Sequence, residues 1–352
     1  MPATTPLREA PRVLASLVAL LTLLAGATGA AAQSDPTKAV YDAARREGTV
    51  VWYTSFPLDE ATPLGEAFQK RYPGVKVEIV RGSGTRLIER FETEYRAGRA
   101  VADVITGAIL DPVLAHKRQG WLMQWQPPEG ARVPAQYKDE GFWYLEGITL
   151  SCMMYHPGRV KRAEVPPEPT GLTEPKWRGR IGSIPGFATG TALEFAYYVE
   201  YILGEKDFAK RLRELSPRMQ TAQAQLVEQV IRGEIDIAFP IADYNLYRFK
   251  KQGAPVECSY PQSGVPANTR PVSIPKNAPH PNAAKLFLNW RLSEEGQRLM
   301  QEGFGMRSVR EGMAPVEGLT PLAELKVLVF DPAKVAAVRE EITARWRAVF
   351  GQ

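Results

Sequence analysis

The feature that most constrains the fold is an alternation of short apolar runs with amphipathic segments in residues 49–120. Residues 49–53 are almost continuously apolar, which is typical of a strand buried on both faces. A segment with helical spacing follows, stops at Pro73-Gly74, and leads to an alternating strand pattern at residues 75–79. A second helical segment and a third strand, at residues 101–106, repeat the order. This βαβα order predicts an α/β fold, with a mostly parallel sheet flanked by helices.

The rest of the chain continues the order less regularly. A long apolar strand is predicted at residues 143–155, and residues 261–271 are turn-rich. Further strands are predicted at 181–184, 256–260 and 272–274, and helices at 206–215, 222–232, 281–292, 293–303 and 332–350. A chain of 352 residues with 44% hydrophobic and 24% charged side chains is expected to form two globular domains.

The first 32 residues have the pattern of a secretory signal peptide. Arg8 and Arg12 precede an apolar run at residues 13–24, and small residues end at Ala32. The run is shorter than the roughly 20 residues of a spanning helix. We therefore predict cleavage after Ala32 and location in the periplasm; the alternative is a retained N-terminal anchor.

The charge and the cysteine content limit which partners and which redox state of the cysteines are expected. The net charge is +5, but basic residues are interleaved with acidic ones, which predicts a solvated surface and no nucleic-acid binding. Export would allow a disulfide between Cys152 and Cys258. Because both lie in apolar, strand-like runs, two buried free thiols are favoured, and the disulfide stays an alternative.

Catalytic motifs are missing from the sequence. None of His116, His156 and His280 has a carboxylate or nucleophile at useful spacing, and His116 is expected on a helix surface. There is no H-E-x-x-H or C-x-x-C motif, and the glycine loops lack the other residues of nucleotide-binding motifs. We predict no catalytic residues and no cofactor; a triad assembled from distant residues stays open.

Residues 233–244 indicate one wall of a ligand cleft. This stretch runs from a turn through a short apolar strand to Asp243 and Tyr244, at the start of a predicted helix. Free backbone N–H groups at a helix start favour anions, and glycine allows close approach. Similar loops give the full set of candidate ligand-binding residues: Ser55, Ser83, Gly84, Thr85, Thr189, Gly190, Thr191, Asp243 and Tyr244. Simple helix capping is the alternative for each loop.

Three larger side chains are weaker candidates. Trp143 could stack on a ligand or anchor the core. Arg81 and Arg270 could bind a carboxylate or phosphate bidentately, or could be solvated surface residues.

An ordered set of short segments resembles a known family. The set comprises the exported N-terminus, residues 50–55, 102–104, 155–157, 174–181, 233–238 and 278–284. Together they resemble the periplasmic solute-binding proteins of ABC importers, of the type II fold, and are similar to the ferric-ion-binding subgroup. The resemblance covers about residues 45–310.

The resemblance implies two lobes joined by two strand crossings, near residues 149–151 and 271–274. Lobe 1 would comprise residues 37–149 and 273–320, lobe 2 residues 150–271, and residues 321–352 a C-terminal helical segment packing on the lobes. A monomer would close on its ligand by hinge motion and dock on a permease at the inner membrane.

The sequence departs from the ferric pattern of this family. Positions that carry a histidine, a glutamate and two tyrosines in ferric-binding relatives fall at about Pro57, near Ala108, and on Asp243-Tyr244. A small organic carboxylate or phosphonate is therefore favoured as the solute. The alternative is a ferric ion held by Tyr244 and Asp243, and alternatives of another class are an exported enzyme and a ligand sensor.

Overall fold

The computed structural model describes Met1 and residues 36–82, 84–107, 110–139 and 141–351. The predicted signal peptide, Ser83 and Ala108 lie outside the described residues. Residues Met1–Ala39 and Val40–Gln352 are separate units, and the fold below concerns the second. Among the described residues, no helix combines the length and the apolar composition needed to cross a bilayer.

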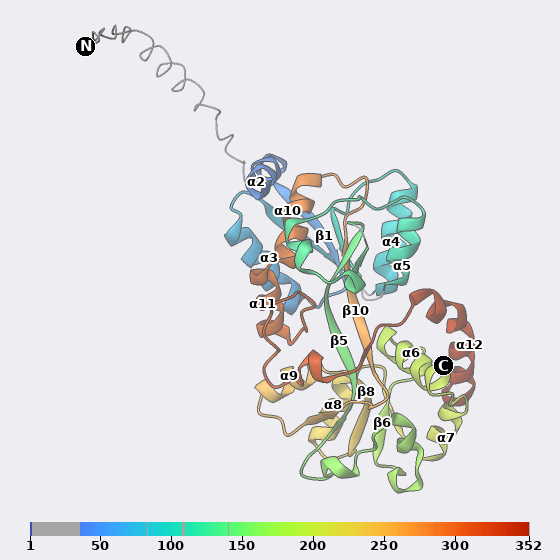
Figure 1. Ribbon diagram of the computed structural model, residues 1–352. Coiled ribbons are helices and arrows are strands. Elements are labelled where there is room, and N and C mark those ends of the chain that lie inside the picture. Colours follow the sequence, from blue (N-terminus) through green and yellow to red (C-terminus); the bar gives the residue numbers. More distant parts are fainter. Residues whose placement is uncertain (2–35, 83, 108–109, 140, 352) are drawn as a thin grey trace. The chain divides into compact units, whose positions relative to one another are not determined.

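The strands and helices of the described chain follow each other largely as the sequence predicts (Figure 1). The strands are β1 (Thr49–Thr54), β2 (Lys76–Arg81), β3 (Val104–Thr106), β4 (Lys138–Asp139), β5 (Trp143–Tyr155), β6 (Ile181–Ser183), β7 (Arg218–Met219), β8 (Ile237–Ala242), β9 (Glu257–Ser259), β10 (Val265–Ser273) and β11 (Val327–Leu328). The helices are α2 (Pro36–Glu47), α3 (Leu58–Arg71), α4 (Gly84–Arg96), α5 (Asp111–Arg118), α6 (Gly190–Tyr197), α7 (Phe208–Glu214), α8 (Gln223–Ile231), α9 (Tyr244–Lys251), α10 (Pro281–Leu292), α11 (Glu294–Phe304) and α12 (Pro332–Phe350).

The strands form a mixed sheet in the order β2-β1-β3-β10-β5-β8-β6-β7. The predicted parallel part is confirmed, since β1 pairs parallel with β2 and β3, and β6 pairs parallel with β7 and β8. The long strands β5 and β10 pair antiparallel with each other. They connect the strands of the first half of the chain with those of the second.

Strand β10 corrects the sequence prediction of a turn-rich segment at residues 261–271. Residues Val265–Ser273 are one continuous strand despite Pro266 and Pro271. The pairing register with β5 shifts between Arg270 and Pro271, and this irregularity accommodates a proline that cannot donate to the ladder. The prolines that predict turns therefore lie within a long strand, which has an irregular register at Arg270 and Pro271.

Aromatic side chains fix the helices on the first part of the sheet. Trp52 of β1 is buried, and its ring centroid lies 5.3 Å from that of Phe287 in α10. Phe68 of α3 meets the same Phe287 edge-on at 4.9 Å. These contacts bury the apolar face of each helix, which is the main source of stability for such layers.

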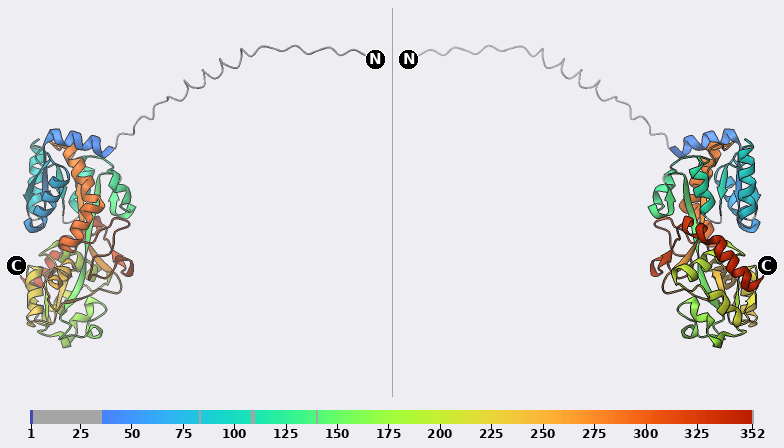
Figure 2. Two further views of the ribbon diagram at one scale, coloured as in Figure 1. Left: turned by 90° about the vertical axis from the view of Figure 1, so that its left-hand side faces the viewer. Right: turned by 90° about the vertical axis from the view of Figure 1, so that its right-hand side faces the viewer.

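Helix α12 packs on the second half of the chain through Trp346, whose side chain is buried. The indole Nε1 of Trp346 donates to Glu200 at 2.7 Å, and its ring lies 6.3 Å from Phe208 of α7. The right-hand view of Figure 2 shows α12, in dark red, lying along this side of the unit. The helix is thereby held beside α6.

A disulfide joins Cys152 and Cys258, which corrects the expectation of two free thiols. Strand β9 pairs antiparallel with β5, and Met154 lies opposite Cys258. This pairing brings the two Cα atoms to 5.7 Å, within the range that a disulfide requires. The residues are 106 apart in sequence, so periodicity could not show that they meet.

Candidate functional site

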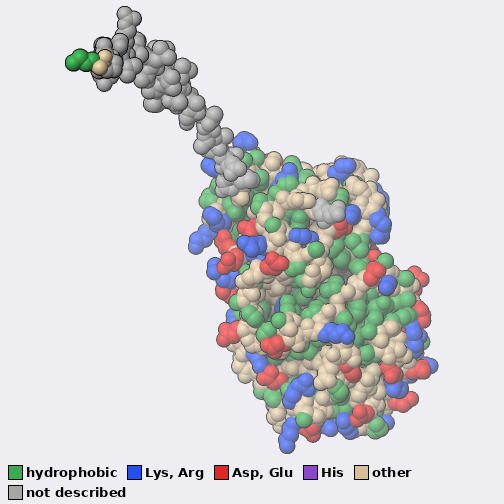
Figure 3. Space-filling view, viewed as in Figure 1, with side chains coloured by type: hydrophobic (Ala, Val, Ile, Leu, Met, Phe, Trp, Pro, Cys, Tyr) green, Lys and Arg blue, Asp and Glu red, His purple; other side chains and the backbone are tan. Residues whose placement is uncertain are grey.

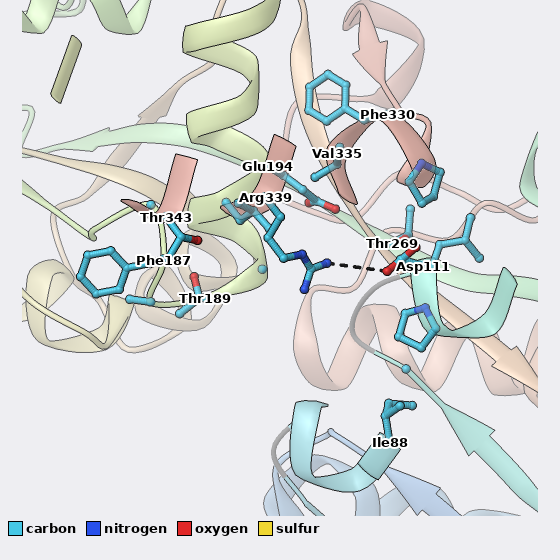
Figure 4. A pocket seen from close by; sticks show the side chains of 18 of the residues that line it. Ile88, Asp111, Phe187, Thr189, Glu194, Thr269, Phe330, Val335, Arg339 and Thr343 are labelled. Carbon is cyan, nitrogen blue, oxygen red and sulfur yellow. Dashed lines mark ion pairs between the residues drawn. The ribbon is translucent and has the colours of Figure 1, made fainter. Parts of the chain in front are cut away.

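A cavity of about 660 Å³ opens where α4, α5, α6 and α12 approach strand β10 (Figure 4). Its walls come from α4 (Ile88, Glu89, Glu92), the β3–α5 region (Gly107, Leu110, Asp111, Pro112), the loop before α6 (Gly186, Phe187, Ala188, Thr189), α6 itself (Gly190, Leu193, Glu194), β10 (Ala267, Thr269) and the C-terminal segment (Phe330, Pro332, Val335, Arg339, Thr343). A volume of this size is typical of sites for small organic molecules. Figure 3 shows the face that is seen in Figure 1. Hydrophobic side chains gather across the middle of that face, and charged side chains lie mostly toward its edges.

The charged groups that line the cavity are mostly acidic. Among the described lining residues these are the carboxyl groups of Glu89, Glu92, Asp111 and Glu194, against the guanidinium of Arg339. Arg339 lies 3.9 Å from Asp111, so an ion pair links α12 to α5 across the cavity (Figure 4).

Glu194 is a lining carboxyl group that has no ion pair within 4.0 Å among the described residues. It lies in α6 between the buried residues Leu193 and Phe195, and its Oε2 is buried without a hydrogen-bond partner among the described residues. Burial raises the pKa of Glu194 to about 8, although the guanidinium groups of Arg270 and Arg339 act to lower it. Carboxyl groups with such shifts are over-represented at functional sites.

Arg270 supplies positive charge from strand β10. Its Nε is buried and has no hydrogen-bond partner among the described residues, and its guanidinium lies 5.8 Å from the ring centroid of Phe56. Arg270 is close enough to Glu60 and Glu194 to act on the pKa of both carboxyl groups. It forms no ion pair within 4.0 Å in the described chain, which leaves it available to an anion.

Glu60 and Tyr244, on two helices, are close enough to Arg270 for its charge to act on their pKa values, and none of the three lines the cavity. Burial raises the pKa of Glu60 to about 7; Arg270 and Arg248 oppose the shift. Burial also raises the pKa of the Tyr244 phenol, again against the influence of Arg270. Since Glu60 lies in α3 and Tyr244 begins α9, the first and second halves of the chain both contribute to this group.

The loop before α6 is placed as the sequence predicts. Thr189 and Gly190 line the cavity, and Thr189 also caps α6, accepting a hydrogen bond from the Ala192 N–H at 3.1 Å. The capping and ligand interpretations of this loop are therefore compatible. Thr191 is partly buried in the first turn and does not line the cavity.

The two loops of the first half are described only in part. Ser55 directly follows β1 and is partly buried, outside the cavity lining. Helix α4 begins at Gly84, with Thr85 as its second residue; Ser83 lies outside the described residues.

Asp243 has protein partners on both carboxylate oxygens. Its Oδ1 accepts from the Leu150 N–H at 2.9 Å, and its Oδ2 accepts from Arg307 Nε at 2.7 Å and from the Tyr260 hydroxyl at 3.1 Å. The side chain is fully buried. These contacts account for Asp243 without a ligand, and the residue does not line the cavity.

The two remaining candidates lie away from the cavity lining. Trp143 begins β5 and is buried in the core, as the alternative interpretation of this residue expects. Arg81 ends β2 and is exposed.

Two histidines have carboxylate partners that spacing did not reveal. His280 Nδ1 lies 2.8 Å from Asp103, and His116 Nε2 lies 3.1 Å from Glu92. His116 is buried and stacks on Trp121, which corrects its predicted surface position. Across the described residues, no group of three or more His, Cys, Asp or Glu side chains could hold a metal ion.

The fold matches solved structures of periplasmic binding proteins. Iron-bound HitA from Pseudomonas aeruginosa aligns with a TM-score of 0.75 at 24% identity, over 86% of this chain and 99% of that chain. AfuA from Actinobacillus pleuropneumoniae, with exogenous fructose-6-phosphate bound, aligns with a TM-score of 0.72 at 23% identity, over 86% and 98%. These matches show that the chain has the type II fold of periplasmic binding proteins.

The sequence itself identifies the family. Residues 57–298, more than half of the chain, match the family described as bacterial extracellular solute-binding protein. The chain belongs to this family of solute-binding transport proteins. It is also 22% identical over 324 residues to the Fe(3+)-binding periplasmic protein of Serratia marcescens, covering 87% of this chain and 88% of that protein.

Three candidate functional residues were not predicted from the sequence. Glu194 lies within the apolar segment Ala-Leu-Glu-Phe-Ala, and a lone carboxylate among apolar helix residues was a usable signal. Glu60 and Arg339 gave no such signal, because both lie in segments rich in charged residues.

Proposed function

We propose that this protein is the receptor of an ABC importer for a small organic anion, a carboxylate or a phosphonate. The family supports the receptor class, and Arg270 carries the proposal about the solute. The buried Nε of its guanidinium has no hydrogen-bond partner among the described residues, and it lies on a strand that pairs with both β3 and β5. Arginine binds carboxylate and phosphonate groups through two parallel hydrogen bonds, which makes an anion the matching ligand.

Two helix starts support the same ligand class. Thr189 and Gly190 begin α6 at the cavity, and Tyr244 begins α9. Backbone N–H groups at these positions favour negative charge. We propose Ser55, the Gly84–Thr85 turn, Thr189, Gly190, Tyr244 and Arg270 as the groups that hold the acidic part of the solute.

A ferric ion is the second candidate, because the named relatives include iron-binding proteins. The residues of this chain favour it less. Tyr244 would be the one phenol at the matching pair of positions, since Asp243 is paired with Arg307 and Tyr260. A positive guanidinium near Tyr244 also opposes binding of a trivalent cation.

The rest of the transport cycle follows from the receptor proposal. The precursor is exported by a signal peptide cleaved after Ala32, and the mature monomer works in the periplasm. Ligand closes the two lobes, residues 37–149 with 273–320 and residues 150–271, and the closed form docks on a permease at the inner membrane. A sensor would need the same closure, so uptake of labelled solute by cells lacking this protein separates transport from sensing.

Native mass spectrometry of the purified protein tests the proposal. We expect a bound small organic acid that is lost from Arg270→Gln and retained by the control Arg218→Gln, whose side chain is exposed on β7. Retention of the same adduct by Arg270→Gln, or a ferric adduct, would contradict the proposal. Chemical conversion of the bound solute by the pure protein would favour an exported enzyme.

A further inference from the structure

We infer that Glu194 accepts a hydrogen bond from a protonated amine of the solute, so that the solute carries an amino group as well as an acidic group. The inference rests on the proposed function and narrows its ligand class to amino-substituted organic anions. Glu194 would determine specificity, while Arg270 would hold the acidic end.

The first support is the unpartnered oxygen of Glu194. The residue lines the cavity, and its Oε2 is buried without a hydrogen-bond partner in the described part of the chain. A buried polar atom left unpaired costs roughly 1–3 kcal/mol. A ligand N–H that donates to this oxygen would remove that cost, so a ligand with a hydrogen-bond donor at this position is favoured.

The second support is the charge of the cavity walls. Glu89, Glu92 and Asp111 line the side formed by α4 and α5, and Arg339 is the guanidinium among the described lining residues. Asp111 already engages Arg339 at 3.9 Å, and Glu92 engages Arg96 at 3.0 Å and His116 at 3.1 Å. The remaining excess is acidic, which favours a cationic group over a second anionic one.

The third support is the relation of Glu194 to Arg270. The charge of the Arg270 guanidinium acts to lower the pKa of Glu194, yet no ion pair within 4.0 Å forms between them in the described structure. When Glu194 is ionised, it and Arg270 carry opposite charges, and neither forms an ion pair within 4.0 Å among the described residues. A solute with an amine and an acidic group matches both charges, as a bare anion does not.

A protonated Glu194 could instead donate to an anionic oxygen, and pH separates these two roles. The pKa of Glu194 is raised to about 8, so the empty site holds a proton at neutral pH. Binding of an ammonium group would release this proton, so affinity would rise with pH toward 8. Donation to an anion would weaken over the same range. The charged groups that act on the pKa of Glu194 are Arg270 and Arg339, and the other carboxyl groups of the cavity lining are Glu89, Glu92 and Asp111.

Isothermal titration calorimetry with matched probes tests the inference. The probes are 4-aminobutanoate with butanoate, 5-aminopentanoate with pentanoate, and 3-aminopropylphosphonate with propylphosphonate. We expect the aminated member of at least one pair to bind at least about tenfold more tightly at pH 7.5, with affinity increasing from pH 6.5 to 8. Glu194→Gln should remove this preference, and the exposed Glu317→Gln should retain it.

The possible failures are distinguishable. If amine-free probes bind as well as their aminated partners, or if Glu194→Gln keeps the preference, the inference is overturned while the receptor for an organic anion stands. If no probe of either series binds, and native mass spectrometry finds no organic acid, the proposed function and this inference fall together. Correct folding of Glu194→Gln is established by an unchanged circular dichroism spectrum.

Discussion

Asp243 and Arg307 form a buried ion pair, with Oδ2 of the aspartate 2.7 Å from Nε of the arginine. Arg307 also donates to the Thr320 carbonyl oxygen at 2.6 Å and to the Tyr260 hydroxyl at 3.1 Å. Asp243 accepts from the Leu150 N–H of β5. One carboxylate therefore joins the start of α9, a long strand and the segment after α11.

Removal of Arg307 should strongly destabilise the protein. Arg307→Leu leaves the Asp243 carboxylate buried without its countercharge, and such changes cost about 3–5 kcal/mol. Urea unfolding followed by tryptophan fluorescence measures the loss. The exposed Arg218→Leu is the control and should change stability by less than about 0.5 kcal/mol. A similar loss in both variants would show that the ion pair is unimportant.

Glu194→Gln should stabilise the ligand-free protein at pH 8 and leave it unchanged near pH 4. The folded state holds the proton of Glu194 up to a pKa of about 8, whereas the unfolded state loses it near the ordinary value of 4.5. Wild-type stability therefore falls as pH rises from 4.5 to 8 and then levels. We expect a gain of at least about 1 kcal/mol at pH 8. Thermal unfolding at both pH values measures it; an equal gain at pH 4 would contradict the assigned shift.

Ferric loading should leave the protein colourless. A ferric ion bound by a tyrosine phenolate gives a visible charge-transfer band, and the arrangement around Tyr244 disfavours such binding. Absorption spectra of wild-type protein and Tyr244→Phe after ferric citrate addition should coincide. A visible band that disappears in Tyr244→Phe and persists in Tyr247→Phe would restore the ferric alternative.

Replacement of both Cys152 and Cys258 by serine should lower stability by about 2–4 kcal/mol. The disulfide closes a long segment of chain and restricts the unfolded state, so its removal favours unfolding. Denaturant unfolding of the double variant, beside wild-type protein with and without reductant, measures the effect. Equal stability of reduced and oxidised wild-type protein would contradict this expectation.

Local patterns predicted most of the fold because they report burial along one element. The bounds of β5, α10 and α12 agree with prediction, since each has a continuous apolar run or a clear periodicity with marked ends. Most of strand β10, residues 265–271, was missed because its prolines and Asn268 are typical of turns. Its pairing on both sides overrides those preferences, and pairing is not visible in a local window.

The candidate site was only partly predictable for the same reason. Thr189 and Gly190 were found because a cap and a glycine mark the start of a helix. The partner of Asp243 is 64 residues away, and no spacing rule links them. The role proposed for Glu194 in binding the solute depends on its position near α12 and β10, which are distant from it in the sequence. Contacts between charged residues that are far apart in the sequence cannot be predicted from local patterns.

The disulfide has a topological consequence for the second half of the chain. Everything between Cys152 and Cys258 belongs to one covalent ring, which includes Thr189, Glu194 and Tyr244, whereas Arg270 lies outside it. A single proteolytic cut within this ring would leave the two fragments tethered until a reductant is added. Glu194, proposed for the amine, thus lies in the cyclic part of the chain, whereas the Arg270 guanidinium, proposed for the acidic end, lies in a linear part.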